Sequence, residues 1–241
     1  MLKEIGYLPV FIGIAITLLT IFLFLKSIAK STLENPAHTG KRIMIFLFFW
    51  LALQAAWGFS GFYANFTELP PHIFLYGVGP AFLFILAVLV FSPWRKGMLK
   101  LDLESLTWIH VVRIPVELGL FLLYQLKTIP EEMTFSGRNF DILSGLTAPL
   151  MIWLIFKKRS AGKNALIAWN LICLALLVNI VLTAVFSMPY PFQKFGMLQP
   201  NKAVFAFPFV WLPTVIVPVV LFSHIASLFK LLSKEHSLKQ K

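Results

Sequence analysis

Long apolar segments alternate with short polar loops along the whole chain. Seven of these segments come close to the roughly 17–25 apolar residues that a helix needs to cross a bilayer. The pattern therefore predicts an all-α, polytopic bundle of seven transmembrane helices that forms a single membrane domain over residues 1–241. The predicted spans are residues 6–25, 43–63, 73–92, 105–126, 142–157, 165–187 and 206–229.

The first apolar segment raises the question of a cleaved signal peptide. The run Leu8–Leu25 is longer than the usual hydrophobic region of such a peptide, and it reaches Lys26 without a small-residue cleavage site. We therefore expect this segment to be retained as the first helix.

Lysine and arginine are distributed unequally between alternate loops. Of the 21 Lys and Arg residues, 15 lie in the loops after spans one, three and five and in the C-terminal tail, five lie on the opposite side, and Arg113 lies inside a span. Short cytoplasmic loops are enriched in Lys and Arg, so the bias predicts an outside N-terminus and a cytoplasmic C-terminus in a cytoplasmic-type cell membrane. The 15 residues are Lys26, Lys30, Lys41, Arg42, Arg95, Lys96, Lys100, Lys157, Lys158, Arg159, Lys163, Lys230, Lys234, Lys239 and Lys241.

The composition agrees with a lipid environment. Hydrophobic residues make up 59% of the chain and charged residues only 13%, against about 25% charged residues in a typical soluble domain. The net charge of +11 follows the loop bias, so we predict the bilayer and not nucleic acid as the partner. The single Cys173 allows no intrachain disulfide, and no Cys/His cluster indicates a metal or a cofactor. The oligomeric state stays open.

The fourth span contains three ionisable residues, which are unusual at membrane depth. His110, Arg113 and Glu117 fall on one helical face, and Pro115 lies between the two charged residues. An ionised side chain in the middle of a membrane helix costs at least about 2.5–3.5 kcal/mol on insertion scales. Such residues are therefore either paired inside the bundle or used in function. Pro115 also leaves the carbonyl of Val111 without its helical donor, which favours a kink here.

The predicted orientation converts sequence position into membrane depth. Four polar residues are expected near the middle of the membrane, and three nearer the cytoplasmic side. The first group is Gln54, Arg113, Glu117 and Asn179, and the second is His110, Asn170 and His224.

These residues admit more than one interpretation. Arg113 and Glu117 can neutralise each other as an i,i+4 pair and hold helices together, or they can form a proton or ion relay or the counter-ions of a ligand. His110 and His224 could ligate a haem, but membrane cytochromes usually have more histidines in their spans, so we predict no cofactor.

The outer loop between spans four and five is a second candidate site. It interleaves aromatic and polar residues and is long for a simple connection. Its ionisable and amide side chains could form an ion-pair cluster above the bundle or line a ligand entrance. The candidates are Glu131, Glu132, Arg138, Asn139 and Asp141.

Three classes of function remain open. The first is binding or movement of a small solute, ion or proton, in which Glu117 exchanges a proton or faces a cation, Arg113 sets its charge state and His110 leads to the cytoplasmic side. In that hypothesis Gln54 and Asn179 orient the site. The second class is an intramembrane or outer-face enzyme that acts on lipid or a lipid-linked substrate through the outer-loop residues. The third is a non-catalytic membrane scaffold or assembly partner.

Overall fold

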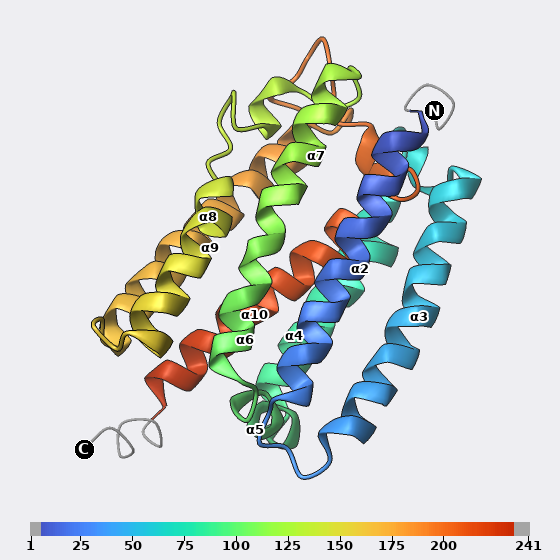
Figure 1. Ribbon diagram of the computed structural model, residues 1–241. Helices are drawn as coiled ribbons and strands as arrows, with labels where there is room; N and C mark the ends of the chain where they lie inside the picture. The colour runs from blue at the N-terminus through green and yellow to red at the C-terminus, as the bar shows by residue number, and fades with distance from the viewer. Residues whose placement is uncertain (1–5, 234–241) are drawn as a thin grey trace.

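The computed structural model describes residues 6–233, and every regular element in this range is a helix (Figure 1). The predicted all-α class is therefore confirmed. The α-helices of the described range are α2 (Tyr7–Ala29), α3 (Pro36–Ser60), α4 (Gly79–Val90), α5 (Ser92–Leu99), α6 (Leu103–Ile109), α7 (Arg113–Gln125), α8 (Ile142–Ile152), α9 (Lys163–Phe186) and α10 (Val217–Leu232). Short 3-10 helices are η1 (Phe62–Ala64), η3 (His110–Val112), η4 (Glu131–Met133) and η6 (Ala203–Phe205), and π-helical turns are η2 (Phe74–Val78), η5 (Trp153–Lys157) and η7 (Leu212–Ile216).

Five helical segments are long and apolar enough to cross a membrane. They are Tyr7–Ala29, Pro36–Ser60, Leu103–Gln125, Lys163–Phe186 and Leu212–Leu232. The segment Phe74–Val90 joins this group only together with α5, from which it is separated by a bend of 90°. The apolar helix Ile142–Lys157 is shorter. The described chain thus has the helices of a membrane protein, and the count of seven spans stays a prediction.

Two helix boundaries differ from those expected. The second helix begins at Pro36 and not at residue 43, because Asn35 caps it: its side-chain oxygen accepts a hydrogen bond from the backbone N–H of His38 at 3.2 Å. Proline at the first helical position has no N–H to leave unsatisfied. The last helix begins at Leu212 and not at residue 206, after the short turn η6.

The fourth predicted span is interrupted close to its charged residues. α6 ends at Ile109, the 3-10 turn η3 follows, and α7 starts at Arg113. Pro115 lacks an N–H to donate back along the helix, which accounts for the tighter turn just before it. The side chain of Arg113 consequently leaves the backbone where the helix changes its winding.

The interrupted α6–α7 segment and α10 lie at the centre of the bundle. α6 packs against α2, α8 and α10, and α9 packs against α10. In the apolar windows of the two central segments, 50% and 56% of the residues are buried, against 11% for α3. The ionisable residues of α7 are therefore enclosed by protein, whereas α3 runs along the side of the bundle (Figure 1).

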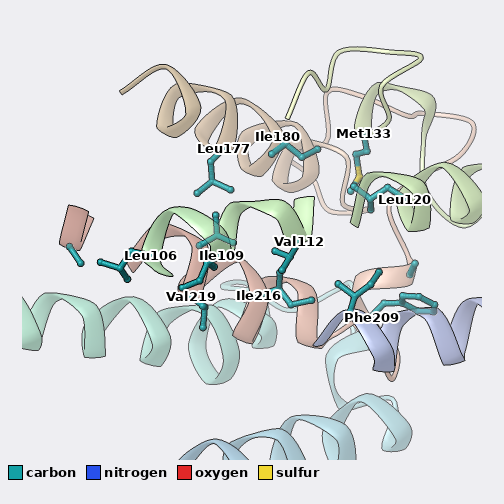
Figure 2. Packing of buried hydrophobic residues seen from close by; sticks show 14 of the residues in the cluster. Leu106, Ile109, Val112, Leu120, Met133, Leu177, Ile180, Phe209, Ile216 and Val219 are labelled. Atoms are coloured by element: carbon teal, nitrogen blue, oxygen red, sulfur yellow. The ribbon is translucent and has the colours of Figure 1, made fainter. Parts of the chain in front are cut away.

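One large apolar cluster joins these central helices. Figure 2 shows Val112 and Leu120 of the central segment against Leu177 and Ile180 of α9 and Ile216 of η7. All five side chains are at most 8% exposed. The apolar packing fixes the spacing between α7, α9 and α10, and the polar side chains described next lie between the same helices.

Candidate functional site

Arg113 is the centre of a buried polar network. Its side chain is 2% exposed, and Nη1 donates to Asp141 Oδ1 at 2.8 Å and to the carbonyl oxygen of Cys173 at 3.1 Å. Nη2 lies 2.9 Å from His224 Nε2. The start of α8, the middle of α9 and α10 thus converge on one guanidinium. A buried ion pair is tolerated when further hydrogen bonds satisfy its remaining donors in this way.

The contacts of His224 fix its tautomer. Asn170 uses its amide nitrogen to donate to the carbonyl of Leu166 at 2.9 Å, so its side-chain oxygen is free to accept from His224 Nδ1, also at 2.9 Å. With the proton on Nδ1, Nε2 is an acceptor for Arg113. His224 is therefore a neutral imidazole that accepts a hydrogen bond from the guanidinium.

His110 lies beside this network without joining it. Its ring stacks on that of His224 with centroids 4.0 Å apart and meets the edge of Trp169 at 5.4 Å. The residue is fully buried, and within the described range neither ring nitrogen has a hydrogen-bond partner. His110 thus packs as a flat ring, and the structure gives it no link toward the cytoplasmic side.

Glu117 lies one helical turn beyond Arg113 and has a different partner. Both of its carboxylate oxygens accept from Asn139 Nδ2 at 2.6 Å, and the same nitrogen also donates to the carbonyl of Met133. The expected mutual pairing of Arg113 and Glu117 is therefore not formed. The loop between α7 and α8 supplies a partner to each group, Asp141 to Arg113 and Asn139 to Glu117.

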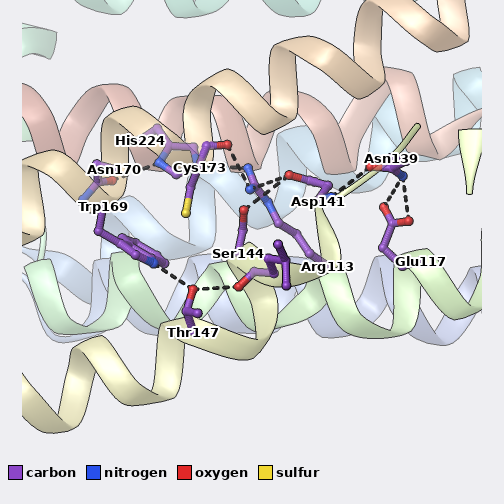
Figure 3. Close-up of polar contacts among 11 residues, drawn as sticks. Arg113, Glu117, Asn139, Asp141, Ser144, Thr147, Trp169, Asn170, Cys173 and His224 are labelled. Atoms are coloured by element: carbon purple, nitrogen blue, oxygen red, sulfur yellow. Dashed lines mark hydrogen bonds and ion pairs between the residues drawn. The ribbon is translucent and has the colours of Figure 1, made fainter. Parts of the chain in front are cut away.

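The network forms one continuous line through the bundle (Figure 3). Asn139 Oδ1 accepts from the backbone N–H of Asp141 at 3.0 Å, which connects the Glu117 contact to the Arg113 contact. The line of contacts runs through Asn170, His224, Arg113, Asp141, Asn139 and Glu117. It joins residues that the sequence placed in three separate groups, at the middle of the membrane, nearer the cytoplasmic side and in the outer loop.

Close backbone approach brings α8 to this position. A Cβ atom added to Gly145 would lie 2.8 Å from Ile114 Cγ1 and 3.0 Å from the backbone nitrogen of Ile114. Only glycine permits this separation, which places the start of α8, and with it Asp141, over the guanidinium of Arg113. Asp141 and Asn139 were predicted as loop residues, and Gly145 is the signal in the sequence that could have indicated their burial.

Gln54 and Asn179 lie outside the network. Gln54 is fully buried, but its amide donates to the carbonyl of Tyr76 at 3.1 Å and accepts from the Tyr63 hydroxyl at 2.6 Å. Asn179 donates to the backbone carbonyl of Arg138 at 2.8 Å. Asn179 therefore holds the outer loop immediately before Asn139, whereas Gln54 belongs to a second polar centre.

The predicted ion-pair cluster of the outer loop is not formed. The guanidinium of Arg138 lies 4.8 Å from the centre of the Phe195 ring, and in the described part of the chain it pairs with none of the loop carboxylates. Glu131 is exposed and Glu132 half-buried at the surface. Asp141, the residue expected beside them, is buried with Arg113. The side chains that could serve an outer-face reaction are therefore dispersed.

A cavity of about 110 Å³ adjoins the charged end of the network. Its lining includes Arg113, Glu117 and Asp141, and the other lining residues are apolar. In the described part of the chain no group of three or more His, Cys, Asp or Glu residues is arranged to hold a metal ion. The arrangement offers two carboxylates and one guanidinium to whatever occupies the cavity.

Residues 70–232 match a protein family described as a domain of unknown function, DUF8737. The match extends over 163 of the 241 residues, from 70 to 232 inclusive, so the chain belongs to this family. The matched range contains the whole polar network around Arg113, whereas Gln54 lies before this range. No curated protein and no solved structure matches the chain.

Proposed function

We propose that the chain is a seven-span protein of a cytoplasmic-type membrane that binds a small solute, an ion or a proton at its polar core and moves it across the membrane. Glu117 is the group that takes up the proton or faces the cation, and Arg113 and Asp141 set the charge around it. The observation that supports this proposal most strongly is the cavity, because it brings these three ionisable side chains together inside an otherwise apolar bundle.

The charge balance of the cavity favours a cationic occupant. Arg113 is in direct contact with Asp141 at 2.8 Å, so these two charges compensate each other. Among the described residues, the hydrogen-bond partner of the Glu117 carboxylate is the neutral amide of Asn139. A carboxylate buried at 1% exposure without a counter-charge is costly. A proton or a cation at Glu117 removes that cost.

The arrangement of the loops supports the proposed orientation. The loops that join α2 to α3, α5 to α6 and α8 to α9 gather at one end of the bundle, where α10 also ends (Figure 1). The beginning of α2 and the loop between α7 and α8 lie at the other end. We count seven crossings, with Phe74–Val90 and Ile142–Lys157 included, and the positive-inside rule favours the end with the Lys-rich loops as the cytoplasmic side.

Thiol labelling of intact cells tests this orientation. Ser136→Cys and Ser160→Cys introduce the same change in exposed loops at the two ends of the bundle, and the native Cys173 is buried at 2% exposure. A membrane-impermeant maleimide is expected to modify the Ser136 variant in intact cells and the Ser160 variant only after lysis. The reverse pattern would show the opposite orientation, and equal labelling of both in intact cells would refute an odd number of crossings between them.

The function is tested in vesicles that contain the purified protein and a trapped pH-sensitive dye. A gradient of protons, Na⁺, K⁺ or ethylammonium is imposed, and the rate of pH change is compared with that of protein-free vesicles. Glu117→Gln is expected to abolish the protein-dependent rate while the protein inserts normally. Glu131→Gln, the same chemical change at an exposed loop position, is expected to leave the rate unchanged.

Two outcomes would contradict the proposal. One is an equal protein-dependent rate in the wild type and the Glu117 variant, which would remove Glu117 from the mechanism. The other is a wild-type rate equal to that of protein-free vesicles for all four gradients, which would refute proton movement and proton-coupled movement of these cations.

A further inference from the structure

The cavity next to Glu117 is almost entirely apolar, and this limits what it can bind. Only three of its 22 lining residues, Arg113, Glu117 and Asp141, are polar. The α9 wall is a helical stripe of Leu177, Ile180, Val181, Ala184 and Val185, and Met188 lines the cavity just after the helix ends. Val112, Leu120, Met133 and Ile216, which belong to the apolar cluster in Figure 2, line it as well. A hydrophilic solute would leave most of this surface without a partner.

Water alone is a poor occupant of the apolar part. A buried water molecule typically makes two to four hydrogen bonds, and cavities lined by aliphatic side chains stay dry. The polar groups of the lining belong to three side chains, and most of their hydrogen-bonding capacity is used inside the network. A cavity of about 150 Å³ accepts benzene, so the 110 Å³ here suit a short apolar segment of a ligand.

The rim of the cavity reaches the side of the bundle. Phe82 of α4 lines the cavity and is 39% exposed, and its neighbours Leu83 and Phe84 are exposed as well. α9 and α4 are both packed against α10 and both contribute walls. The exposed surface at this rim is apolar, so a ligand can extend from the cavity into the hydrocarbon of the bilayer.

The polar residues of the lining determine which polar head group such a ligand would carry. Glu117 presents a carboxylate without a counter-charge, which favours a cation. Arg113 lines the same cavity, and within the described range its buried Nε–H has no acceptor. Besides its cationic group, the ligand could therefore carry one hydrogen-bond acceptor, such as a hydroxyl, that accepts from Arg113 Nε–H.

We propose that the cavity binds an amphiphilic amine, in which an apolar chain lies against α9 and α4 and a single ammonium group pairs with Glu117. This inference rests on the proposed function, in that Glu117 faces a cation, and it adds that the ligand reaches the site with an apolar tail from the lipid phase. An ethylammonium ion has the head without the tail, and an octanoate ion has a tail with the wrong charge.

The thermal unfolding of the protein in lipid nanodiscs tests the proposal. Ligands that bind only the folded state raise the unfolding temperature, by about 5–10 °C for a chain of this size at a concentration about 100-fold above the dissociation constant. We expect this shift with octylammonium, and a smaller or absent shift with octanol, octanoate and ethylammonium at the same concentration. Glu117→Gln is expected to lose the octylammonium shift, and Glu131→Gln to keep it.

A substitution in the cavity wall tests separately whether the apolar chain of the ligand lies in the cavity. Ala184→Phe fills part of the cavity from α9 without altering a charged residue, and we expect it to abolish the octylammonium shift. If this variant does not fold, the comparison of chain lengths on the wild-type protein decides the same point.

The outcomes separate this inference from the proposed function. Equal shifts with ethylammonium and octylammonium, both lost in the Glu117 variant, would overturn the apolar tail and leave a cation site at Glu117. An octylammonium shift that persists in Glu117→Gln, or an equal shift with octanoate, would overturn the pairing of Glu117 with an ammonium group. No shift with any of the four compounds would refute the amphiphilic ligand, while the vesicle assay still tests cation or proton movement independently.

Discussion

Two buried polar centres occupy the bundle, and they differ in how completely they are satisfied. Around Gln54, the Tyr63 hydroxyl donates to the side-chain oxygen and the carbonyl of Tyr76 accepts from the amide nitrogen, and nearby Trp50 Nε1 donates to the carbonyl of Thr214 at 3.0 Å. All of these side chains are neutral. Around Arg113 the groups are ionisable; within residues 6–233, His110 and Arg113 Nε have no hydrogen-bond partner, and Glu117 is held by a neutral amide.

The packing differs in the same way. A Cβ on Gly77 would lie 2.7 Å from Thr214 Cγ2 and 3.3 Å from Gln54 Oε1, so the neutral centre is closed by direct contact. The charged centre opens into a cavity. A buried polar group that is fully paired fixes helices relative to one another, whereas one that keeps spare hydrogen-bonding capacity beside a cavity can accept a ligand. The comparison favours a structural role for Gln54 and agrees with the role proposed for Glu117.

The largest expected effect comes from breaking the ion pair of the charged centre. Arg113→Leu leaves Asp141 as a buried carboxylate without its counter-charge, and removal of one member of such a pair lowers the free energy of unfolding by about 3–5 kcal/mol. We expect the double variant Arg113→Leu with Asp141→Asn to recover most of this stability, as measured by SDS-induced unfolding in mixed micelles. Equal stability of the single and double variants would contradict the Arg113–Asp141 assignment.

The sequence predicted these two centres unequally. The apolar periodicity gave the helices, because spanning length and hydrophobicity are properties of each segment by itself. The burial of Arg113 and Glu117 could also be predicted, because both lie within a long apolar segment. Their partners did not, because Asp141 and Asn139 reach them from a loop whose path depends on tertiary packing. A carboxylate near a helix start is usually a surface group, and here the absent side chain of Gly145 lets it descend into the bundle.

The predicted membrane depth of a residue was also not enough to predict which side chains it contacts. Gln54, Glu117 and Asn179 were expected at a similar level, yet Gln54 contacts Tyr63 and Tyr76, and Asn179 holds the backbone of the outer loop. Residues at equal depth meet only if their helices are neighbours and their faces oppose each other, and a single sequence contains neither fact. His224 and Asn170 do meet because α9 and α10 pack together.

An intermediate effect is expected at the neutral centre. Gln54→Leu leaves the Tyr63 hydroxyl without its acceptor, and an unsatisfied buried group costs about 1–3 kcal/mol. The additional change Tyr63→Phe removes that group and should restore part of the stability. Both variants are expected to keep the protein-dependent rate of pH change in vesicles. A loss of that rate at unchanged stability and insertion would place Gln54 in the functional site and break the contrast between the centres.

The smallest expected effect, and the only gain, concerns His110. Its two ring nitrogens are buried beside His224 without hydrogen-bond partners in the described range, although its ring packs well against His224 and Trp169. His110→Phe keeps a flat ring there and removes the unsatisfied nitrogens, so we expect the free energy of unfolding to rise by about 1 kcal/mol. A decrease would show that those nitrogens have partners in the membrane. The vesicle rate then decides the role of His110: a stabilised variant that retains the rate makes His110 a packing residue, whereas a stabilised variant that loses it shows that the unpaired imidazole is kept for function at the expense of stability.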